Sequence, residues 1–469
     1  MAERKNDIAV VGLGVMGANL ARNFRSRGLR VGGYDRRPEA GARLRQVAPD
    51  IDVADRLEEM VARLERPRRI VAMVQAGAPV DAVLDALDPL LESDDIVVDA
   101  GNSLYSDTDR RCTRAAERPW RFVGMGVSGG SEGALKGPAM MPGGDQQAYQ
   151  HLRPALEAAA AVGPAGPCVT YCGSGSAGHF VKMVHNGIEY GDMQLIAESA
   201  LLLREGLGLG AAAVADTFAE WNQTELASYL IEITEEIYRF EDPEKPGSLL
   251  LDSVLDAAGQ KGTGLWTVIA ALELGVAVPT IAAALDARSL SAQRALRLCA
   301  EKTFGAGARP RVTGIAPHDI AAALYASKLS SYAQGFSMLR QASVERGYGI
   351  DLPETARIWT AGCIIRAALL DRIRAALGGE PQPELLVLAP EFVVQIRERI
   401  TAWRAVVSRA AAAGYAIPGL AASLSWFETL TTARGSAALL QAQRDYFGSH
   451  TYERLDRPGE SIHTDWGGG

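Results

Sequence analysis

The run Gly12-Leu13-Gly14-Val15-Met16-Gly17 is the feature that most constrains what this chain can fold into. It follows the apolar run Ile8–Val11 and leads into a segment with apolar residues at helical spacing. In such a strand–turn–helix unit the first glycine permits a tight turn, the second lets a pyrophosphate approach the backbone, and the third lets helix and strand pack. Free amides and the helix dipole favour an anion at this point. All six residues are therefore predicted to bind a dinucleotide; a turn that is merely tightly packed is the alternative.

The choice between NAD and NADP rests on Asp35-Arg36-Arg37, which ends the second predicted strand, Arg30–Tyr34. A carboxylate in this place accepts the ribose hydroxyls of NAD and repels the 2′-phosphate of NADP. Guanidinium groups, in contrast, pair well with phosphate. The two signals conflict, so all three residues are predicted to contact the cofactor and its identity stays open between NADP and NAD.

The pattern of apolar residues divides the chain into three parts. Residues 1–176 alternate strand-like runs with amphipathic helical segments, which predicts an α/β Rossmann-type dinucleotide-binding domain with a parallel sheet. The strand-like runs are Ile8–Val11, Arg30–Tyr34, Arg69–Val74, Ile96–Asp99, Arg121–Met125 and Cys168–Tyr171. Residues 177–434 lose these runs and predict a large all-helical domain, beginning with a long helix from Ala177 to Glu205. Tyr190–Leu195 resembles Gln334–Leu339, so this domain is either duplicated or similar to itself by chance.

Residues 435–469 form a C-terminal tail that begins with a helical run and then becomes polar. A disordered tail is one interpretation. Against it stand Tyr446, Phe447, Tyr452 and Trp466, which are costly to leave in water. We therefore expect the tail to dock on another surface.

Composition excludes several classes of protein. A chain of 469 residues is too long for one core. Its net charge of −8 lacks the basic character of nucleic-acid-binding proteins. No apolar run reaches the roughly 18 residues that a membrane helix needs, so no membrane is expected. The five cysteines form neither a disulfide framework nor a zinc pattern, and no metal is expected. The short polar start leaves no room for a signal peptide, which favours a cytoplasmic location.

Three further segments of interest follow the first motif, and two of them are rich in glycine. Val98–Ser103 ends a predicted strand on polar groups, where ligands bind in open α/β sheets. Val123–Gly130 and Met141–Gly144 are predicted as glycine-rich turns. Together they indicate a cleft lined by backbone amides, which suits a carboxylate.

The segment Gly178–Tyr190 carries the densest chemistry. On a helix, Lys182, His185, Asn186 and Glu189 share one face, because they are spaced three, four and seven residues apart. A solvated polar face is the alternative interpretation, but apolar residues cover much of the remaining circumference. A buried polar stripe is expensive unless it holds a ligand, so the stripe is predicted to be a site.

With these motifs the chain resembles the 6-phosphogluconate dehydrogenase family over essentially its whole length. These enzymes of the pentose phosphate pathway, in the β-hydroxyacid dehydrogenase superfamily, convert 6-phosphogluconate to ribulose 5-phosphate and CO₂ while reducing a nicotinamide cofactor. The matching runs are Gly12–Leu20, Asp99–Ser103, Gly126–Gly130, Gly178–Leu195, Gln260–Gly264, Asp286–Arg288 and Arg444–Tyr452.

The resemblance implies roles for individual residues. Lys182 would be the general base at the C3 hydroxyl, and Glu189 would protonate C1 of the enediol. Substrate-binding residues would be Asn102, Ser128, Gly129, Gly130, His185, Asn186, Tyr190, Lys261 and Arg288, with Arg444 and His450 supplied by the partner subunit of a homodimer. Val74, Gln75, Ala76 and Asn102 would lie at the cofactor.

Some residues depart from the family's pattern. Asp35 stands where NADP-using members mostly carry asparagine, Gln75 stands where a lysine is usual, and Pro38–Ala40 lacks an expected lysine. These departures bear on the cofactor, not on the reaction. A non-decarboxylating β-hydroxyacid dehydrogenase and a catalytically inert dinucleotide-binding sensor are the rival interpretations. The first usually has a shorter chain without the phosphate-binding set, and the second would be expected to lack Lys182 or Glu189.

Overall fold

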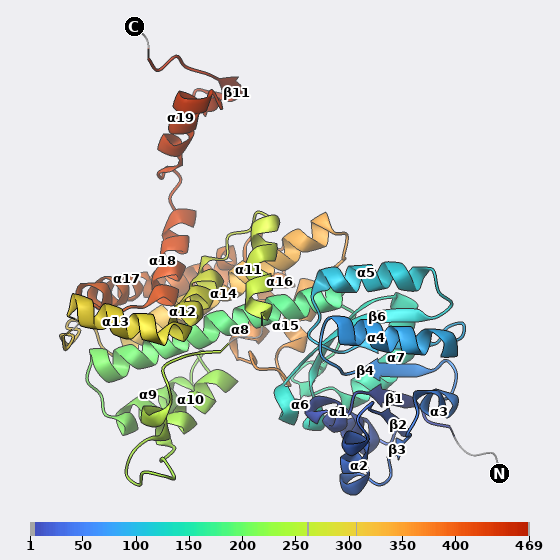
Figure 1. Cartoon of the computed structure of the whole chain (residues 1–469). Coiled ribbons are helices and arrows are strands. Elements are labelled where there is room, and N and C mark those ends of the chain that lie inside the picture. Colours follow the sequence, from blue (N-terminus) through green and yellow to red (C-terminus); the bar gives the residue numbers. More distant parts are fainter. Residues whose placement is uncertain (1–4, 260–261, 306, 468–469) are drawn as a thin grey trace.

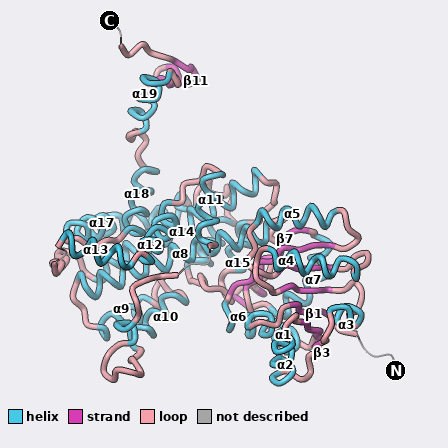
Figure 2. The backbone as a smooth tube through the Cα atoms, in the orientation of Figure 1, coloured by secondary structure: helices cyan, strands magenta, loops and turns pink. Residues whose placement is uncertain are grey.

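A computed structural model describes residues 5–259, 262–305 and 307–467. Figure 1 shows a sheet flanked by helices at the N-terminal end, a large array of helices beside it, and a C-terminal tail that projects away from both. In Figure 2 the strands gather in the N-terminal part, with a short pair near the C-terminus. The expected α/β Rossmann-type fold followed by a mostly helical part is confirmed.

A seven-stranded sheet organises the N-terminal part, with strand order β3-β2-β1-β4-β5-β6-β7. Strands β1 to β6 are parallel along this order, and β7 runs antiparallel to β6. The strands are β1 (Ile8–Val11), β2 (Val31–Tyr34), β3 (Asp52–Val53), β4 (Arg69–Ala72), β5 (Ile96–Asp99), β6 (Arg121–Ser128) and β7 (Ala139–Gly144). The helices are α1 (Val15–Ser26), α2 (Pro38–Val47), α3 (Leu57–Ala62), α4 (Ala78–Leu87), the short η1 (Asp88–Leu90), α5 (Tyr105–Ala116), α6 (Gly130–Lys136) and α7 (Gln146–Ala159). A small pair, β8 (Val162–Gly163) and β9 (Gly166–Pro167), follows.

The second glycine-rich region was predicted wrongly. Residues 123–128 belong to β6 and residues 141–144 to β7, so only Gly129, with φ of 120°, lies in a bend, and Gly130 already begins α6. The glycines serve packing instead, because a Cβ on Gly126 would lie 2.2 Å from the Cβ of Lys182. The sheet predicted as parallel thus carries one antiparallel edge strand.

The predicted strand Cys168–Tyr171 is also not a regular strand. Val169 makes an isolated bridge to Met140. On either side of it, the Met140 amide donates to the Cys168 carbonyl and the Cys172 amide donates to the Pro142 carbonyl. Pro142, opposite this segment, has no N–H to donate, so a continuous ladder cannot form there.

The helical part is built around α8 (Ala177–Leu201), which continues as a π-helical turn, η2 (Leu202–Gly206). The predicted end of this helix at Gly206 is confirmed. The remaining helices are α9 (Ala211–Trp221), α10 (Tyr229–Arg239), η3 (Leu250–Ser253), α11 (Thr263–Glu273), α12 (Pro279–Ala292), α13 (Arg294–Phe304), α14 (Pro317–Glu345), α15 (Leu352–Ile358), α16 (Leu369–Leu377), η4 (Leu386–Leu388), α17 (Pro390–Ala412) and α18 (Pro418–Leu430).

The order of these helices repeats. A long helix, two short ones and a pair of helices run from α8 to α12, and the same series runs from α14 to α18. The two long helices meet reciprocally, with Gly191 of α8 against Ser331 and Gly335 of α14 against Ile188. These observations support the proposal that residues 177–434 are duplicated.

The tail consists of α19 (Ala437–Gly448) and a hairpin of β10 (Tyr452–Arg454) and β11 (Arg457–Ile462). Its helical start is as predicted. The polar segment that was interpreted as disordered or docked forms this hairpin, which folds back on α19. No described helix is long and apolar enough to cross a membrane.

Candidate active site

The glycine loop lies between β1 and α1, and each glycine has its own steric reason. Gly12 has φ of 93°, and a Cβ there would lie 2.5 Å from the carbonyl oxygen of Met73. A Cβ on Gly17 would lie 1.9 Å from the carbonyl oxygen of Gly12. Gly14, in contrast, faces open space. No side chain caps α1, so its first amides are free for an anion. The loop therefore fits a dinucleotide pyrophosphate.

Asp35 lies beside this loop at the end of β2. Its Oδ2 accepts a hydrogen bond from the Leu13 amide at 2.7 Å, and its Oδ1 accepts from the Arg37 amide at 2.9 Å. The Arg37 guanidinium also donates to Asp35 at 3.2 Å. Burial opposes ionisation, but these hydrogen bonds outweigh it and hold the pKa of Asp35 below its ordinary value. The carboxylate is thus ionised and fixed next to the turn, while Arg36 is exposed.

The N-terminal half of α8 is pressed directly onto the sheet. A Cβ on Gly178 would lie 2.2 Å from the carbonyl oxygen of Gly124 and 2.4 Å from that of Met141. Helix and strands therefore touch through main-chain atoms. This contact brings Lys182 of α8 next to Gly126 and fixes its height above the sheet.

The predicted stripe on α8 is buried, and its members are close together. His185 Nδ1 lies 3.3 Å from Lys182 Nζ and 3.2 Å from Asn186 Oδ1, and its Nε2 lies 3.1 Å from the hydroxyl of Ser128. Glu189 Oε2 is 3.8 Å from His185 Nδ1. Lys182 is 6% exposed and His185 fully buried, so the solvated-face interpretation is wrong.

Burial shifts the proton affinities of this group in useful directions. Desolvation lowers the pKa of Lys182 below the ordinary value of a lysine. Desolvation, together with the neighbouring Lys182, lowers the pKa of His185 well below its ordinary value, so the imidazole is neutral. Desolvation raises the pKa of Glu189. Burial thus shifts the amine toward its neutral form and the carboxyl group toward its protonated form, the directions that a base and an acid would need.

A second group begins at Tyr190, the residue that follows Glu189 in α8. The guanidinium of Arg288, from α12, stacks over the ring of Tyr190 at 3.8 Å from its centroid. Arg288 also contributes to the electrostatics at Glu189. A Cβ on Gly264 would lie 2.6 Å from the Tyr190 ring, so α11 borders the same place. The cation and the phenol can hold an anion near the acid–base pair.

The remaining predicted residues are placed as follows. Asn102 is exposed in the loop after β5, and Gln75 is exposed after β4, flanked by partly buried Val74 and Ala76. Gly129 connects β6 to α6, and Gly130 is the first residue of that helix. Lys261 lies outside the described residues. Arg444 and His450 are exposed on the tail, which Figure 1 shows clear of the other groups.

Sequence reasoning missed two contributors. The buried ring of Trp359, at the end of α15, packs edge-on against His185 with centroids 5.6 Å apart. Gly126 provides the space for Lys182. A signal for the glycine was present in the second glycine-rich segment, but it was interpreted as a turn. Nothing near Trp359 in the sequence connects it with α8.

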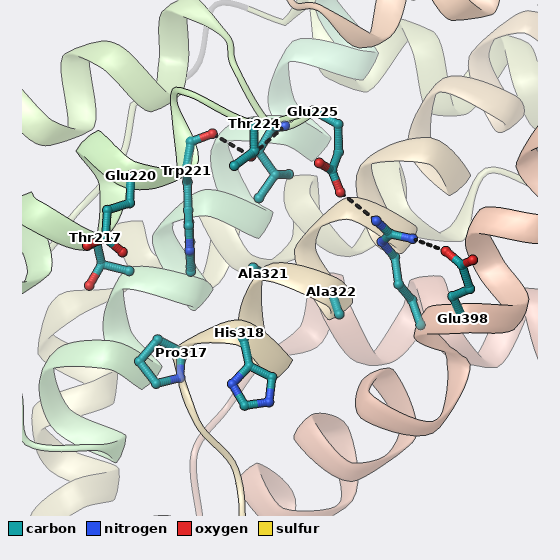
Figure 3. Close-up of a pocket in the computed structure, with 12 residues that line it drawn as sticks. Thr217, Glu220, Trp221, Thr224, Glu225, Pro317, His318, Ala321, Ala322 and Glu398 are labelled. Atoms are coloured by element: carbon teal, nitrogen blue, oxygen red, sulfur yellow. Dashed lines mark hydrogen bonds and ion pairs between the residues drawn. The ribbon is translucent and has the colours of Figure 1, made fainter.

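Figure 3 shows a different hollow, of about 670 Å³, in the helical part between α9, the start of α14 and α17. Its floor carries an ion-pair chain in which Arg399 contacts Glu225 at 2.5 Å and Glu398 at 3.3 Å. None of the residues predicted for cofactor or substrate lines it. Within the described residues, no group of three or more His, Cys, Asp or Glu side chains is arranged to hold a metal ion.

A Rossmann-type sheet has an open glycine loop after its first strand, and α8 packs against the same sheet with a lysine, a histidine and a partly buried glutamate on one face. Together they define a dinucleotide-dependent dehydrogenase. Family models agree. Residues 7–173 match the NAD binding domain of 6-phosphogluconate dehydrogenase, and residues 178–466 match the C-terminal domain of 6-phosphogluconate dehydrogenase. The chain belongs to the 6-phosphogluconate dehydrogenase family, and is an oxidoreductase with an NAD(P)-binding domain.

Individual relatives cover the whole chain. A decarboxylating 6-phosphogluconate dehydrogenase of Synechocystis is 50% identical over 98% of this chain and 98% of the relative. The NADP(+)-dependent decarboxylating enzyme of Bacillus subtilis is 46% identical over 98% of this chain and 99% of its own. The Plasmodium falciparum enzyme, solved in its apo form and with NADP+ or 6-phosphogluconate, is 41% identical with a TM-score of 0.95, covering 98% of this chain and 100% of that chain.

Proposed function

We propose that this chain oxidises and decarboxylates 6-phosphogluconate to ribulose 5-phosphate and CO₂ while reducing NAD(P)+. The observation that carries the proposal is the buried stripe on α8, where a lysine with a lowered pKa and a glutamate with a raised pKa flank a neutral histidine. The full-length similarity to decarboxylating relatives supports it over the non-decarboxylating alternative. The presence of both Lys182 and Glu189 supports it over an inert sensor.

Lys182 begins the chemistry in this proposal. Its neutral amine takes the proton of the C3 hydroxyl, and the bound nicotinamide ring supplies the acceptor for the hydride. The lysine, now an ammonium, donates to the new ketone oxygen and stabilises the negative charge that develops there as CO₂ leaves. The ammonium gives its proton to that oxygen, which leaves an enediol and a neutral amine. Glu189 then gives its proton to C1 of the enediol while the Lys182 amine takes the proton of the enediol hydroxyl, and the ketone of ribulose 5-phosphate forms. No step calls for a metal.

The substrate is held along its length by the other residues. Ser128, Gly129 and Gly130 bind the carboxylate end, and Asn102, His185 and Asn186 bind hydroxyls. The hydrogen bond between Ser128 and His185, at 3.1 Å, supports this arrangement because it joins the two sets. Tyr190, Lys261 and Arg288 bind the phosphate, which the stacking of Arg288 on Tyr190 supports.

For the cofactor, we propose that NAD serves at least as well as NADP. The fixed, ionised Asp35 supports this, because it repels a 2′-phosphate. Arg37 is engaged with Asp35, which leaves it less available to that phosphate. The Bacillus subtilis and Plasmodium falciparum relatives are described with NADP+. This chain would therefore differ from them in its cofactor preference, with Asp35 and Gln75 as the residues that depart from the pattern of NADP-using family members.

We also propose a homodimer in which Arg444 and His450 of each tail reach the phosphate site of the other subunit. Exposed apolar side chains on the tail, Leu439, Leu440, Tyr446 and Phe447, are 59–72% exposed and support a docking role. On α11, Leu265, Ile269 and Leu272 form an exposed apolar stripe at helical spacing.

The proposed domain boundaries divide the chain into residues 1–176, 177–434 and 435–469. The cytoplasmic location stays a prediction.

Release of CO₂ tests the proposed reaction. Purified protein is mixed with carboxyl-labelled 6-phosphogluconate and either NAD or NADP, and labelled CO₂ and reduced cofactor are measured together. Equal amounts of both products are expected. Reduced cofactor without CO₂ would identify a non-decarboxylating dehydrogenase, and neither product would leave an inert binding protein.

Subunit exchange tests the role of the tail in trans. Lys182→Ala and Arg444→Ala proteins, each nearly inactive, are mixed in equal amounts. Half of the dimers become hybrids with one intact site, so activity recovers to about a quarter of wild type. If each tail served its own subunit, no activity would return after confirmed exchange.

A further inference from the structure

Asp445 is the buried centre of the tail. It is the only buried residue of α19, and its carboxylate is fully enclosed. Four donors converge on it. Oδ1 accepts from the Thr451 amide and from His463 Nδ1, each at 2.9 Å. Oδ2 accepts from the Thr464 amide at 3.1 Å and from the indole N–H of Trp466 at 2.8 Å.

These bonds join two segments that are far apart along the tail. Thr451 belongs to the turn that follows α19, whereas His463, Thr464 and Trp466 follow β11. Burial alone would raise the pKa of Asp445, but the hydrogen bonds from the returning segment outweigh it and lower that pKa. An ionised carboxylate thus ties the end of the described chain onto the turn.

The turn needs this restraint because of its backbone. Ser449 and Thr451, on either side of His450, have φ of 51° and 60°, and neither is a glycine. A residue other than glycine keeps such a left-handed conformation only where its surroundings enforce it, and these residues cluster at functional sites. Further restraints come from the Ser449 amide, which donates to the Asp445 carbonyl at 2.9 Å, and from Gln441, which donates to the Thr451 carbonyl at 2.6 Å.

We propose that Asp445 is a positioning residue that preorganises Arg444 and His450 for the partner's phosphate site, and that the segment His463–Trp466 is its lock. This inference rests on the proposed role of the tail in trans. Arg444 is next to Asp445 in α19, and His450 lies inside the strained turn that Asp445 holds. The two side chains are therefore fixed relative to each other before the tail docks, which reduces the ordering that binding requires.

The test compares substrates with and without the phosphate group. Asp445→Asn keeps the shape of the side chain but replaces one acceptor oxygen with a donor. We expect kcat/KM for 6-phosphogluconate to fall about 10- to 100-fold, as for a misplaced binding group. The value for unphosphorylated gluconate, measured at high enzyme concentration, stays within about twofold of wild type, as does the affinity for the dinucleotide. Trp466→Phe removes the indole N–H that donates to Asp445 but keeps an aromatic ring. It should change the ratio of the kcat/KM values for 6-phosphogluconate and gluconate in the same direction as Asp445→Asn, but by less.

Asp456→Asn is the matched control. Asp456 lies in the turn of the same hairpin and pairs with exposed Arg454, so this variant keeps the wild-type ratio. A purely structural role for Asp445 predicts equal losses with both substrates and a loss of dimer by sedimentation, and that outcome overturns the proposal. An unchanged ratio in Asp445→Asn overturns it as well. If wild-type protein converts neither substrate, the proposed function fails, and the role of Asp445 is then tested by hydrogen exchange. If the Thr451 and Thr464 amides stay protected from exchange in Asp445→Asn, the proposal that His463–Trp466 is held in place by Asp445 is refuted.

Discussion

Replacing Gly126 with alanine tests whether the height of Lys182 above the sheet is set by the missing side chain. The new Cβ would lie 2.2 Å from the Cβ of Lys182 and 2.7 Å from its Cγ. Non-bonded carbon atoms need about 3.5–4.0 Å, so lysine and strand must separate by more than about 1 Å. A displacement of that size at a reacting group costs about 100-fold in rate. Overpacking costs about 1–3 kcal/mol of stability. Gly126→Ala is therefore expected to fold, with a kcat about 100-fold lower.

Initial rates of cofactor reduction at saturating substrate measure kcat, and urea unfolding measures stability. Gly210→Ala is the matched control, because Gly210 precedes α9, has an ordinary negative φ and faces open space. Both quantities should stay near wild type in the control. A folded Gly126→Ala protein with more than half of the wild-type kcat would refute the reasoning, since the lysine would then tolerate the displacement.

Three further predictions concern individual side chains. Lys182→Ala lowers turnover by about 10²–10⁴-fold while dinucleotide binding, followed by fluorescence titration, is unchanged; a variant that keeps most of its activity removes Lys182 as the base. Asp35→Asn shifts the ratio of kcat/KM values for NAD and NADP toward NADP, because the repulsion of the 2′-phosphate is relieved; an unaltered ratio contradicts the proposal. Turnover needs the neutral amine of Lys182, whose pKa is lowered, and the protonated carboxyl group of Glu189, whose pKa is raised. The rate should therefore decline toward low pH, where Lys182 is protonated, and toward high pH, where Glu189 is ionised. Glu189→Gln should abolish the alkaline limb and keep the acid one, and a variant profile with both limbs intact would exclude Glu189 as the acid.

Features that depend on neighbouring residues were predictable from the sequence. The alternation of strands and helices, the glycine loop and the end at Gly206 of the helix that α8 and η2 form together all follow from local spacing. The stripe of Lys182, His185, Asn186 and Glu189 was predictable for the same reason, because helical geometry fixes which side chains share a face. Here a short stretch of sequence contains the whole signal.

Features that depend on tertiary contacts were not predictable in this way. Gly126 and Gly143 have the composition of a turn, but they lie in strands because α8 presses on them, and α8 comes much later in the chain. Trp359 packs on His185 from a distant helix. Asp445 looks like an ordinary polar residue of an exposed helix, since its donors come from 6 to 21 residues further on. Only the folded chain shows what these residues contact.

The main-chain contact between α8 and the sheet limits how the N-terminal and helical parts can move against each other. Most domain hinges and sliding motions use a layer of adaptable side chains, and here Gly178 meets the main chain of Gly124 and Met141 with no such layer between them. A swing of one domain against the other would drive backbone into backbone. We therefore expect the N-terminal and helical parts to move as one rigid body. Ligands would then enter and leave through the loops that follow the parallel strands and past the tail. Solution scattering should then give the same radius of gyration with and without bound dinucleotide, and a contraction on binding would argue for a hinge elsewhere.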